Sequence, residues 1–116
     1  MKDNCIQYIE LYAPDLTKIK QFYANIFGWK FTDYGEGYTA FTNSGVEGGF
    51  EKREAVVRGG PLIILYCAKL EQAKDAVMEG GGVICKDIFS FPGGRRFHFI
   101  DPGGNELAVW SDIQAP

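Results

Sequence analysis

The chain has 116 residues, of which 46% are hydrophobic and 23% are charged, values typical of one globular domain with its own core. The net charge of −3, without a long basic stripe, argues against a nucleic-acid partner. No apolar run is long enough to span a membrane and the first residues lack a signal-peptide core, so we expect a cytoplasmic protein without a membrane partner.

Strand and helix patterns follow one another in the first half of the chain. Residues 5–13 alternate and are rich in Ile, Leu and Tyr, which indicates a strand, and Asp15 is a good helix N-cap. Apolar residues then recur at helical spacing until Gly28 ends the helix. The Gly48-Gly49 pair indicates a bulge or a close backbone approach within a later strand. Three strands are expected after the helix, at 29–34, 38–42 and 46–53.

The same order begins again after a polar, glycine-containing connector. A strand at 61–67 precedes a helix at 69–79, which three glycines at 80–82 end. The loop 90–94 separates two of the later strands, and the turn 101–105 joins the last two. In that turn the Asp side chain can accept from backbone N–H groups, and Gly104 accepts a positive φ. The three later strands are expected at 83–89, 95–100 and 106–111.

The two halves are related by a fixed offset of 54 residues, which predicts an internal repeat. Six positions are identical in this single register, across the strand, the helix and the glycine that ends the helix. The pairs are Ile9 with Ile63, Leu11 with Leu65, Tyr12 with Tyr66, Leu16 with Leu70, Lys20 with Lys74 and Gly28 with Gly82.

Strand alternation within the repeat predicts which side chains line a common concave face. Ile9 and Leu11 should pack beneath the first helix, and Ile63 and Leu65 beneath the second. The residues between them then face the opposite side, together with Ala108 and Trp110 of the last strand. This predicted ligand-binding set is Tyr8, Glu10, Tyr12, Leu62, Ile64, Tyr66, Ala108 and Trp110.

The sequence resembles the vicinal oxygen chelate superfamily of glyoxalase I, bleomycin-resistance proteins and extradiol dioxygenases. The resemblance rests on Pro14-Asp15-Leu16, Phe22-Tyr23, Phe27-Gly28-Trp29 and the turn at 101–105. It implies an α+β fold in one domain, residues 1–116, with two βαβββ modules at about 5–53 and 61–112. Their eight strands would curve into a cup, with the helices on its outer face. The resemblance also implies a homodimer, which would cover exposed strand edges.

Family enzymes usually hold a divalent metal in the cup, and the resemblance places the usual ligands on Tyr8, Leu62 and Ala108. A fourth position falls near 48–51. Leu and Ala cannot bind a metal and neutral Tyr is a poor ligand, so we expect no metal cofactor. A rearranged site built from Glu10, Glu51 and His98 is the alternative.

Three further groups have both a structural and a functional interpretation. Glu10 lies in a strand expected to be buried, where a carboxylate needs a partner, and Arg95 or Arg96 could supply it. His98, the only His, is expected to be a hydrogen-bonded structural residue. Cys5, Cys67 and Cys85 lack CxxC spacing and are expected to be buried free thiols.

The favoured function is a protein that binds a small molecule in the cup without metal, as the resemblance to bleomycin-resistance proteins implies. A metal-dependent lyase, isomerase or dioxygenase with displaced ligands is the second hypothesis. The third is a non-catalytic accessory domain whose cup is filled as core. Whether the chain catalyses any reaction stays open at this point.

Overall fold

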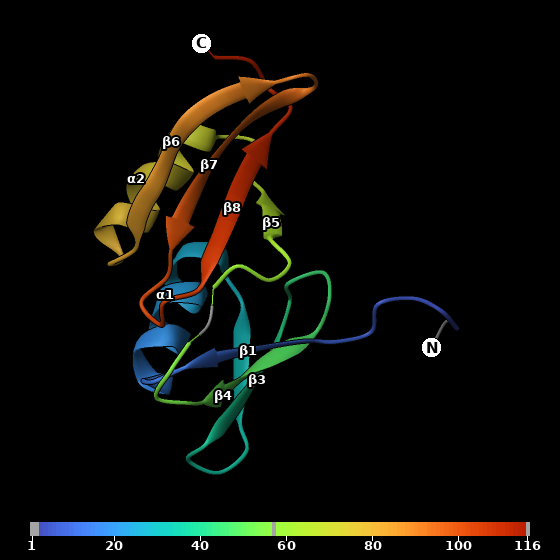
Figure 1. Ribbon diagram of the computed structural model, residues 1–116, viewed down its shortest axis with the longest axis vertical. Coiled ribbons are helices and arrows are strands. Elements are labelled where there is room, and N and C mark those ends of the chain that lie inside the picture. The colour runs from blue at the N-terminus through green and yellow to red at the C-terminus, as the bar shows by residue number, and fades with distance from the viewer. Residues whose placement is uncertain (1–2, 57, 116) are drawn as a thin grey trace.

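The computed structural model describes residues 3–56 and 58–115, and its two halves repeat the same order of elements (Figure 1). The first module contains β1 (Ile9–Ala13), α1 (Leu16–Phe27), β2 (Lys30–Asp33), β3 (Tyr38–Thr42) and β4 (Gly48–Lys52). The second contains β5 (Ile63–Tyr66), α2 (Leu70–Glu79), β6 (Val83–Phe91), β7 (Gly94–Ile100) and β8 (Glu106–Ser111). The predicted α+β fold with two βαβββ modules is therefore confirmed, and the two helices begin 54 residues apart.

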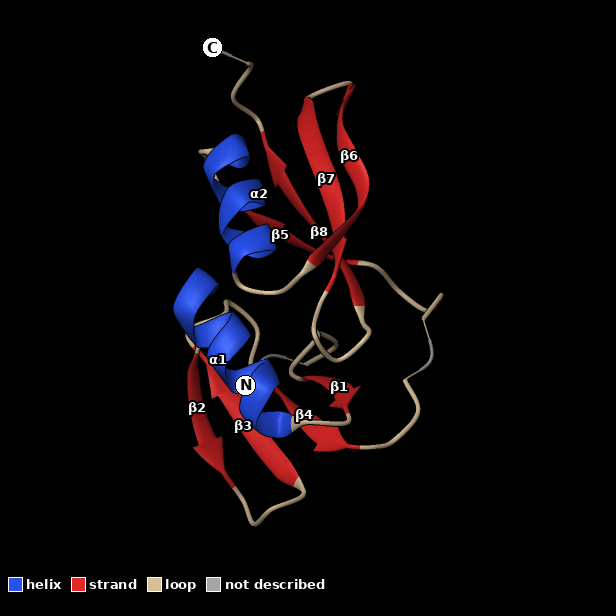
Figure 2. Ribbon diagram, turned by 90° about the vertical axis from the view of Figure 1, so that its left-hand side faces the viewer, coloured by secondary structure: helices blue, strands red, loops and turns tan. Residues whose placement is uncertain are grey.

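The eight strands are divided between two hydrogen-bonded sheets of four, with the orders β1-β4-β3-β2 and β5-β8-β7-β6. In each sheet the first strand pairs in parallel with the last, and the other pairs are antiparallel. The helices lie on the same side of the molecule, with one sheet beside each of them (Figure 2). Strands β1 and β5 are consequently edge strands, which matters for the exposure of their side chains.

Helix α1 begins and ends where the sequence predicts. The Asp15 carboxylate accepts a hydrogen bond from the Lys18 backbone N–H at 3.1 Å, and Gly28 ends the helix with a φ of 73°. The apolar stripe of the helix is buried, with Ile19, Phe22 and Tyr23 almost completely covered. An amphipathic stripe capped at both ends thus fixes the position of the helix on its sheet.

One cluster of buried aromatic side chains joins the two modules. The Tyr23 ring stacks on Trp29, with 4.5 Å between the ring centroids, within the first module. Phe22 and Phe27 of the same helix lie 5.8 and 6.2 Å from Phe99 on β7. Because Phe99 belongs to the second module, α1 packs against both modules and the core is continuous between them.

The turn between β7 and β8 is held by the buried carboxylate of Asp101. One of its oxygens accepts from the Gly103 and Asn105 backbone N–H groups, each at 2.9 Å, as the sequence predicts. Gly104 has a φ of 98°, which confirms the positive φ predicted there. The other carboxylate oxygen accepts from the Tyr23 hydroxyl of α1 at 2.7 Å. The turn is therefore attached directly to the helix of the other module.

Several expectations from the sequence need correction. Strand β1 begins at Ile9, so residues 5–8 precede it, and β6 continues through Ser90 and Phe91 of the expected loop 90–94. Cys5 and Cys85 are exposed and only Cys67 is partly covered, so the prediction of three buried thiols is wrong. Cys5 lies before the first strand and Cys85 lies on an edge strand, and neither position is covered on both sides.

Within the described residues, no helix is long and apolar enough to cross a membrane.

The Tyr23 to Asp101 hydrogen bond gives a prediction about stability and pH. Burial raises the pKa of Asp101, while hydrogen bonds from Tyr23, Asn105 and Gly103 favour its ionised form. Tyr23→Phe removes one of these donors and should cost about 1–3 kcal/mol of unfolding free energy at neutral pH. The loss of unfolding free energy should be smaller at a pH below 3.8, the ordinary pKa of this carboxyl. There the carboxyl is protonated in both the folded and the unfolded state.

Urea unfolding of parent and variant at neutral pH and near pH 3.5 measures this difference. Tyr34→Phe is the matched control, because Tyr34 is 65% exposed and should tolerate the change at both pH values. An equal loss for Tyr23→Phe at both pH values would show that the hydroxyl does not act through the ionised carboxylate.

Candidate functional site

Alternation along the strands separates a core face from an outer face in both modules. Leu11, Ile63 and Leu65 pack against the buried core, and Leu107 and Val109 of β8 are completely buried within it. Leu11, Ile63 and Leu65 are three of the four residues that the repeat assigns to the helix side. The fourth, Ile9, is partly covered and is not among the side chains packed against this core. The intervening residues consequently project from the opposite faces of the two sheets.

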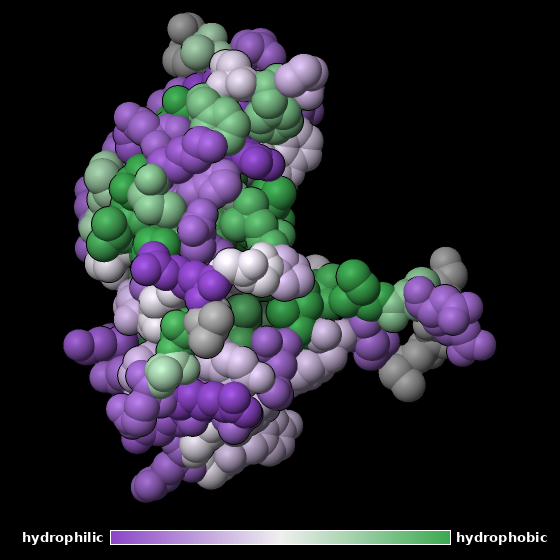
Figure 3. Space-filling view, in the orientation of Figure 1, coloured by the Kyte–Doolittle hydropathy of each residue, from purple (hydrophilic) through white to green (hydrophobic). Residues whose placement is uncertain are grey.

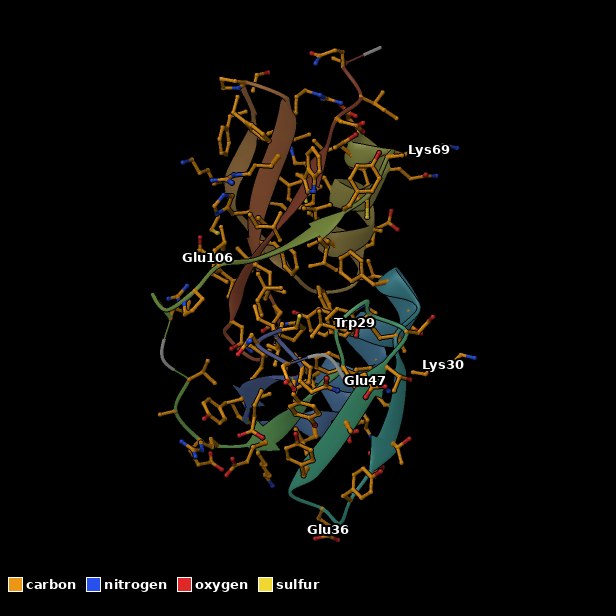
Figure 4. The ribbon with its side chains drawn as sticks, turned by 90° about the vertical axis from the view of Figure 1, so that its right-hand side faces the viewer. Trp29, Lys30, Glu36, Glu47, Lys69 and Glu106 are labelled. Carbon is orange, nitrogen blue, oxygen red and sulfur yellow. The ribbon has the colours of Figure 1, made fainter. Side chains whose placement is uncertain are left out.

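Residues of both modules line a hollow of about 390 Å³ beside the linker that joins them, here called the linker hollow. Figure 4 shows Glu106 where the two modules meet. The hollow combines two carboxylates, one guanidinium, a phenol and several aliphatic side chains. Its lining consists of Glu10, Leu11, Tyr12, Arg58, Gly59, Gly60, Pro61, Leu62, Ile63, Asn105 and Glu106.

Three of the eight predicted cup residues, Glu10, Tyr12 and Leu62, line the linker hollow. The sequence reasoning did not select Arg58, Asn105 or Glu106. Glu106 could have been selected, because it lies on the same side of β8 as two predicted residues. Arg58 lies in an irregular linker, where no periodicity indicates direction.

Glu10 is exposed, so the expectation that it is buried is wrong, and β1 being an edge strand explains why. Neither expected arginine partner reaches it. Arg95 forms a bidentate ion pair with Glu71 of α2, and Arg96 lies over the rings of β6. Glu10 instead lies beside the Tyr38 hydroxyl. Burial raises the pKa of that hydroxyl, and Tyr8 and Glu10 raise it further.

Tyr8 and Tyr12 contact different partners on the first sheet. The Tyr8 hydroxyl forms a short hydrogen bond with the Tyr38 hydroxyl. The Arg53 guanidinium lies over the Tyr12 ring at 4.1 Å from its centroid, and Arg53 also pairs with Glu51 at 3.4 Å. Aromatic and cationic groups therefore cover part of this face, while Glu10 keeps no ion pair among the described residues.

Gly48 and Gly49 make the close backbone approach that their sequence predicts. A side chain on Gly48 would meet the Ile9 carbonyl oxygen, and one on Gly49 would meet the Tyr38 and Tyr8 hydroxyls. The absence of side chains at both positions lets β4 lie tightly between β1 and β3 and leaves space for the phenols.

Ile64 and Tyr66 line a different hollow of about 470 Å³, here called the apolar groove, between the edges of β1 and β5. The molecule is hollowed on the side between the second module and the N-terminal segment, and hydrophobic side chains follow that side (Figure 3). The Tyr66 hydroxyl donates to Asp112 at 2.6 Å, and its ring lies 5.2 Å from Trp110. The remaining lining includes Ile9, Leu11, Ile26, Phe27, Trp29, Phe41, Val46 and Leu65.

The two predicted residues of β8 lie beneath other side chains rather than at an open surface. Ala108 has no exposed surface, and Trp110 is partly covered, with Phe91 6.5 Å from its ring. Beside Ala108, His98 on β7 is 7% exposed and pairs through Nδ1 with Glu106 at 3.0 Å. His98 is thus hydrogen-bonded, as expected for a structural residue.

The residues at the usual metal positions do not fit a metal ion. The side chains of Leu62 and Ala108 have no atom that can ligate a metal, and the Tyr8 hydroxyl is hydrogen-bonded to the Tyr38 hydroxyl. Among the described residues, no three His, Cys, Asp or Glu side chains come together as a possible ligand group. Two of the three alternative ligands, Glu10, Glu51 and His98, have other partners. Glu51 pairs with Arg53, and His98 pairs with Glu106.

Paired βαβββ modules that share a core and line a common hollow define the chain as a vicinal oxygen chelate type of protein. The chain belongs to the Glyoxalase/Bleomycin resistance protein/Dioxygenase superfamily, whose family model matches residues 5–109. A "Glyoxylase-like domain-containing protein" from Didymella fabae is 30% identical, and the match covers 90% of this chain and 91% of the relative.

Solved structures show the same fold at lower sequence identity. A glyoxalase/bleomycin resistance protein/dioxygenase family enzyme from Burkholderia phytofirmans PsJN superposes with a TM-score of 0.80 at 11% identity, over 93% of this chain and 98% of that one. A glyoxalase-related enzyme from Fulvimarina pelagi also gives a TM-score of 0.80, at 17% identity, over 93% and 88% of the two chains. At these identities the likeness concerns the fold alone.

The donor set leads to a prediction about metal content. Because Tyr8, Leu62 and Ala108 stand at the usual ligand positions, protein purified without chelator should contain no stoichiometric Ni, Zn, Mn or Fe. Elemental analysis measures this content, and added ions should leave the melting temperature unchanged, since tight binding to the native state would raise it. About one metal ion per chain would contradict the interpretation of these three residues.

Proposed function

We propose that the protein binds a small, partly aromatic molecule, neutral or cationic, in the linker hollow without a metal cofactor. The observation that carries the proposal is the meeting of both modules at one hollow. Glu10 and Tyr12 come from the first module, and Leu62 and Glu106 come from the second. Apolar walls with a few polar groups are the usual composition of ligand pockets.

The charges of the hollow support a neutral or cationic ligand with Glu10 as its polar anchor. Glu10 is exposed and without an ion pair among the described residues, so a ligand can reach it. Glu106 adds a second carboxylate that is shared with His98. Two carboxylates against the single guanidinium of Arg58 in the lining favour a cationic group, and the Tyr12 ring already accommodates one cation, that of Arg53.

The open hollow favours ligand binding over an accessory domain whose cup is only core. The metal-dependent lyase, isomerase or dioxygenase hypothesis is weaker, because the donor set does not fit a metal. We also propose a cytoplasmic location, since three unpaired thiols suit a reducing compartment.

A second copy of the chain is part of this proposal. The apolar groove lies at the edge strand β5, where Ile64 and Tyr66 are 43% and 50% exposed, and Ile6 before β1 is 78% exposed. Edge strands with exposed apolar side chains are commonly covered by a partner. A homodimer would bury these side chains and satisfy the free edge of β5.

The ligand proposal is tested with a library of neutral and cationic aromatic molecules, read by thermal shift and followed by titration. Glu10→Gln should weaken binding of cationic hits about tenfold or more, because a charge-assisted hydrogen bond becomes a neutral one. Leu62→Trp should block the hollow sterically.

Glu36→Gln is the matched control, because Glu36 is an exposed carboxylate at the far end of the first module (Figure 4). It should bind every hit like the parent. Hits that bind Glu10→Gln and Leu62→Trp as tightly as the parent would place the ligand elsewhere.

The homodimer is tested by sedimentation velocity. Ile64→Asp should shift the protein to a monomer, because a carboxylate would be buried in the contact. Met78→Asp is the control, since Met78 is 47% exposed on α2, away from β5, and should leave the dimer intact. A parent protein that sediments as a monomer throughout the micromolar range would refute this part of the proposal.

A further inference from the structure

Two buried side-chain nitrogens in the described part of the chain have no hydrogen-bond partner, and both belong to residues that neighbour Phe89. They are Arg96 Nε and His98 Nε2. Both residues belong to β7 and are two positions apart, so their side chains project from the same face of the sheet. A buried polar nitrogen without a partner costs free energy, and two of them on one face of the sheet indicate a ligand for both.

The Glu106 carboxylate holds His98 through Nδ1, which leaves Nε2 as the unpartnered nitrogen of the ring. Its Nδ1 pairs with Glu106 at 3.0 Å, and Glu106 lies opposite Ile100 in the register of β7 and β8. Nδ1 therefore points toward the Ile100 end of β7. The His98 ring also lies 5.9 Å from the Phe89 ring, and the Arg96 guanidinium lies over that same Phe89 ring.

Arg96 differs from the neighbouring arginine in having no carboxylate partner among the described residues. Arg95, on the other face, is held in a bidentate pair with Glu71. The Arg96 guanidinium lies instead 5.3 Å from the Phe89 ring centroid and 5.6 Å from that of Phe91. An arginine held over aromatic rings keeps its donors available for a planar anion.

A third basic group completes the cluster. Lys86 Nζ lies 4.5 Å from the Phe89 ring centroid, and the Phe89 ring lies 5.9 Å from the His98 ring. The only carboxylate that pairs with these groups among the described residues is Glu106, which contacts His98 alone. The face therefore carries an excess of positive charge around two phenylalanine rings. We call Lys86, Phe89, Phe91, Arg96 and His98 the β7 basic patch.

We propose that the β7 basic patch binds a small aromatic molecule that carries a carboxylate or a phosphate-type group. The anion would accept hydrogen bonds from the Arg96 guanidinium and, with His98 as an imidazolium whose Nδ1 donates to Glu106, from His98 Nε2, while Lys86 adds charge. The aromatic part would pack on Phe89 and Phe91. This site is separate from the linker hollow, although the His98 to Glu106 pair lies between the two.

Phe89 is the side chain that must move for the anion to reach the covered nitrogens. It lies within contact range of both Arg96 and His98. The register of β6 against β7 is broken between Lys86 and Phe89, so a regular ladder does not hold this segment. A rotamer change of Phe89 is therefore compatible with an intact sheet.

Isothermal titration with benzoate and with phenylphosphonate tests the proposal, and benzamide is the uncharged control ligand. One or both anions should bind and benzamide should bind at least tenfold more weakly, because it lacks the charge that Arg96 pairs with. Comparison of the two anions distinguishes a carboxylate site from a phosphate-type site. Arg96→Gln should weaken anion binding at least tenfold, and Arg96→Lys should retain part of it.

Arg53→Gln is the matched control, because Arg53 also lies over an aromatic ring but belongs to the other module. It should bind the anions like the parent, as should Glu36→Gln. Circular dichroism verifies that each variant is folded, and Lys86→Gln, at an exposed position, should weaken binding even where Arg96→Gln does not fold. No binding of either anion by the parent, or unchanged binding by folded Arg96→Gln, would overturn the proposal.

Discussion

The buried carboxylate of Asp101 is the constraint on which the arrangement of the two modules depends. It accepts from the Tyr23 hydroxyl and from two backbone N–H groups of its own turn. Asn105 in that turn donates to the Tyr12 carbonyl oxygen at the end of β1. Helix α1, strand β1 and the β7–β8 turn are thereby attached to one another. A carboxylate without these donors would be costly in a site that is 3% exposed.

This attachment also determines where the linker hollow forms. Tyr12 and Asn105, which the turn holds together, are both part of its lining. Because β1 and β5 remain edge strands, their outward side chains are not covered by a neighbouring strand. The same feature that leaves Glu10 available to a ligand leaves Ile64 exposed, so the proposed ligand site and the proposed dimer contact have one structural origin.

The fold was predictable because its signals are local and occur twice. The cap at Asp15, the stop at Gly28 and the alternation around Leu107 and Val109 each depend on neighbouring residues. The site was less predictable because it depends on which strands lie at sheet edges. The exposure of Glu10 follows from such an edge, and the hydrogen bond between Tyr23 and Asp101 joins residues 78 positions apart. Neither leaves a periodic signal in the sequence.

The repeat also shows how two similar modules come to offer different chemistry. At the offset of 54 residues, Tyr8 corresponds to Leu62 and Glu10 to Ile64, so the first sheet presents phenols and a carboxylate where the second presents aliphatic groups. The second module instead places Lys86 of β6 and Arg96 of β7 over phenylalanine rings. The repeat therefore preserves the core positions, while the outward positions of the two sheets have diverged. The shared fold alone does not determine what either face binds.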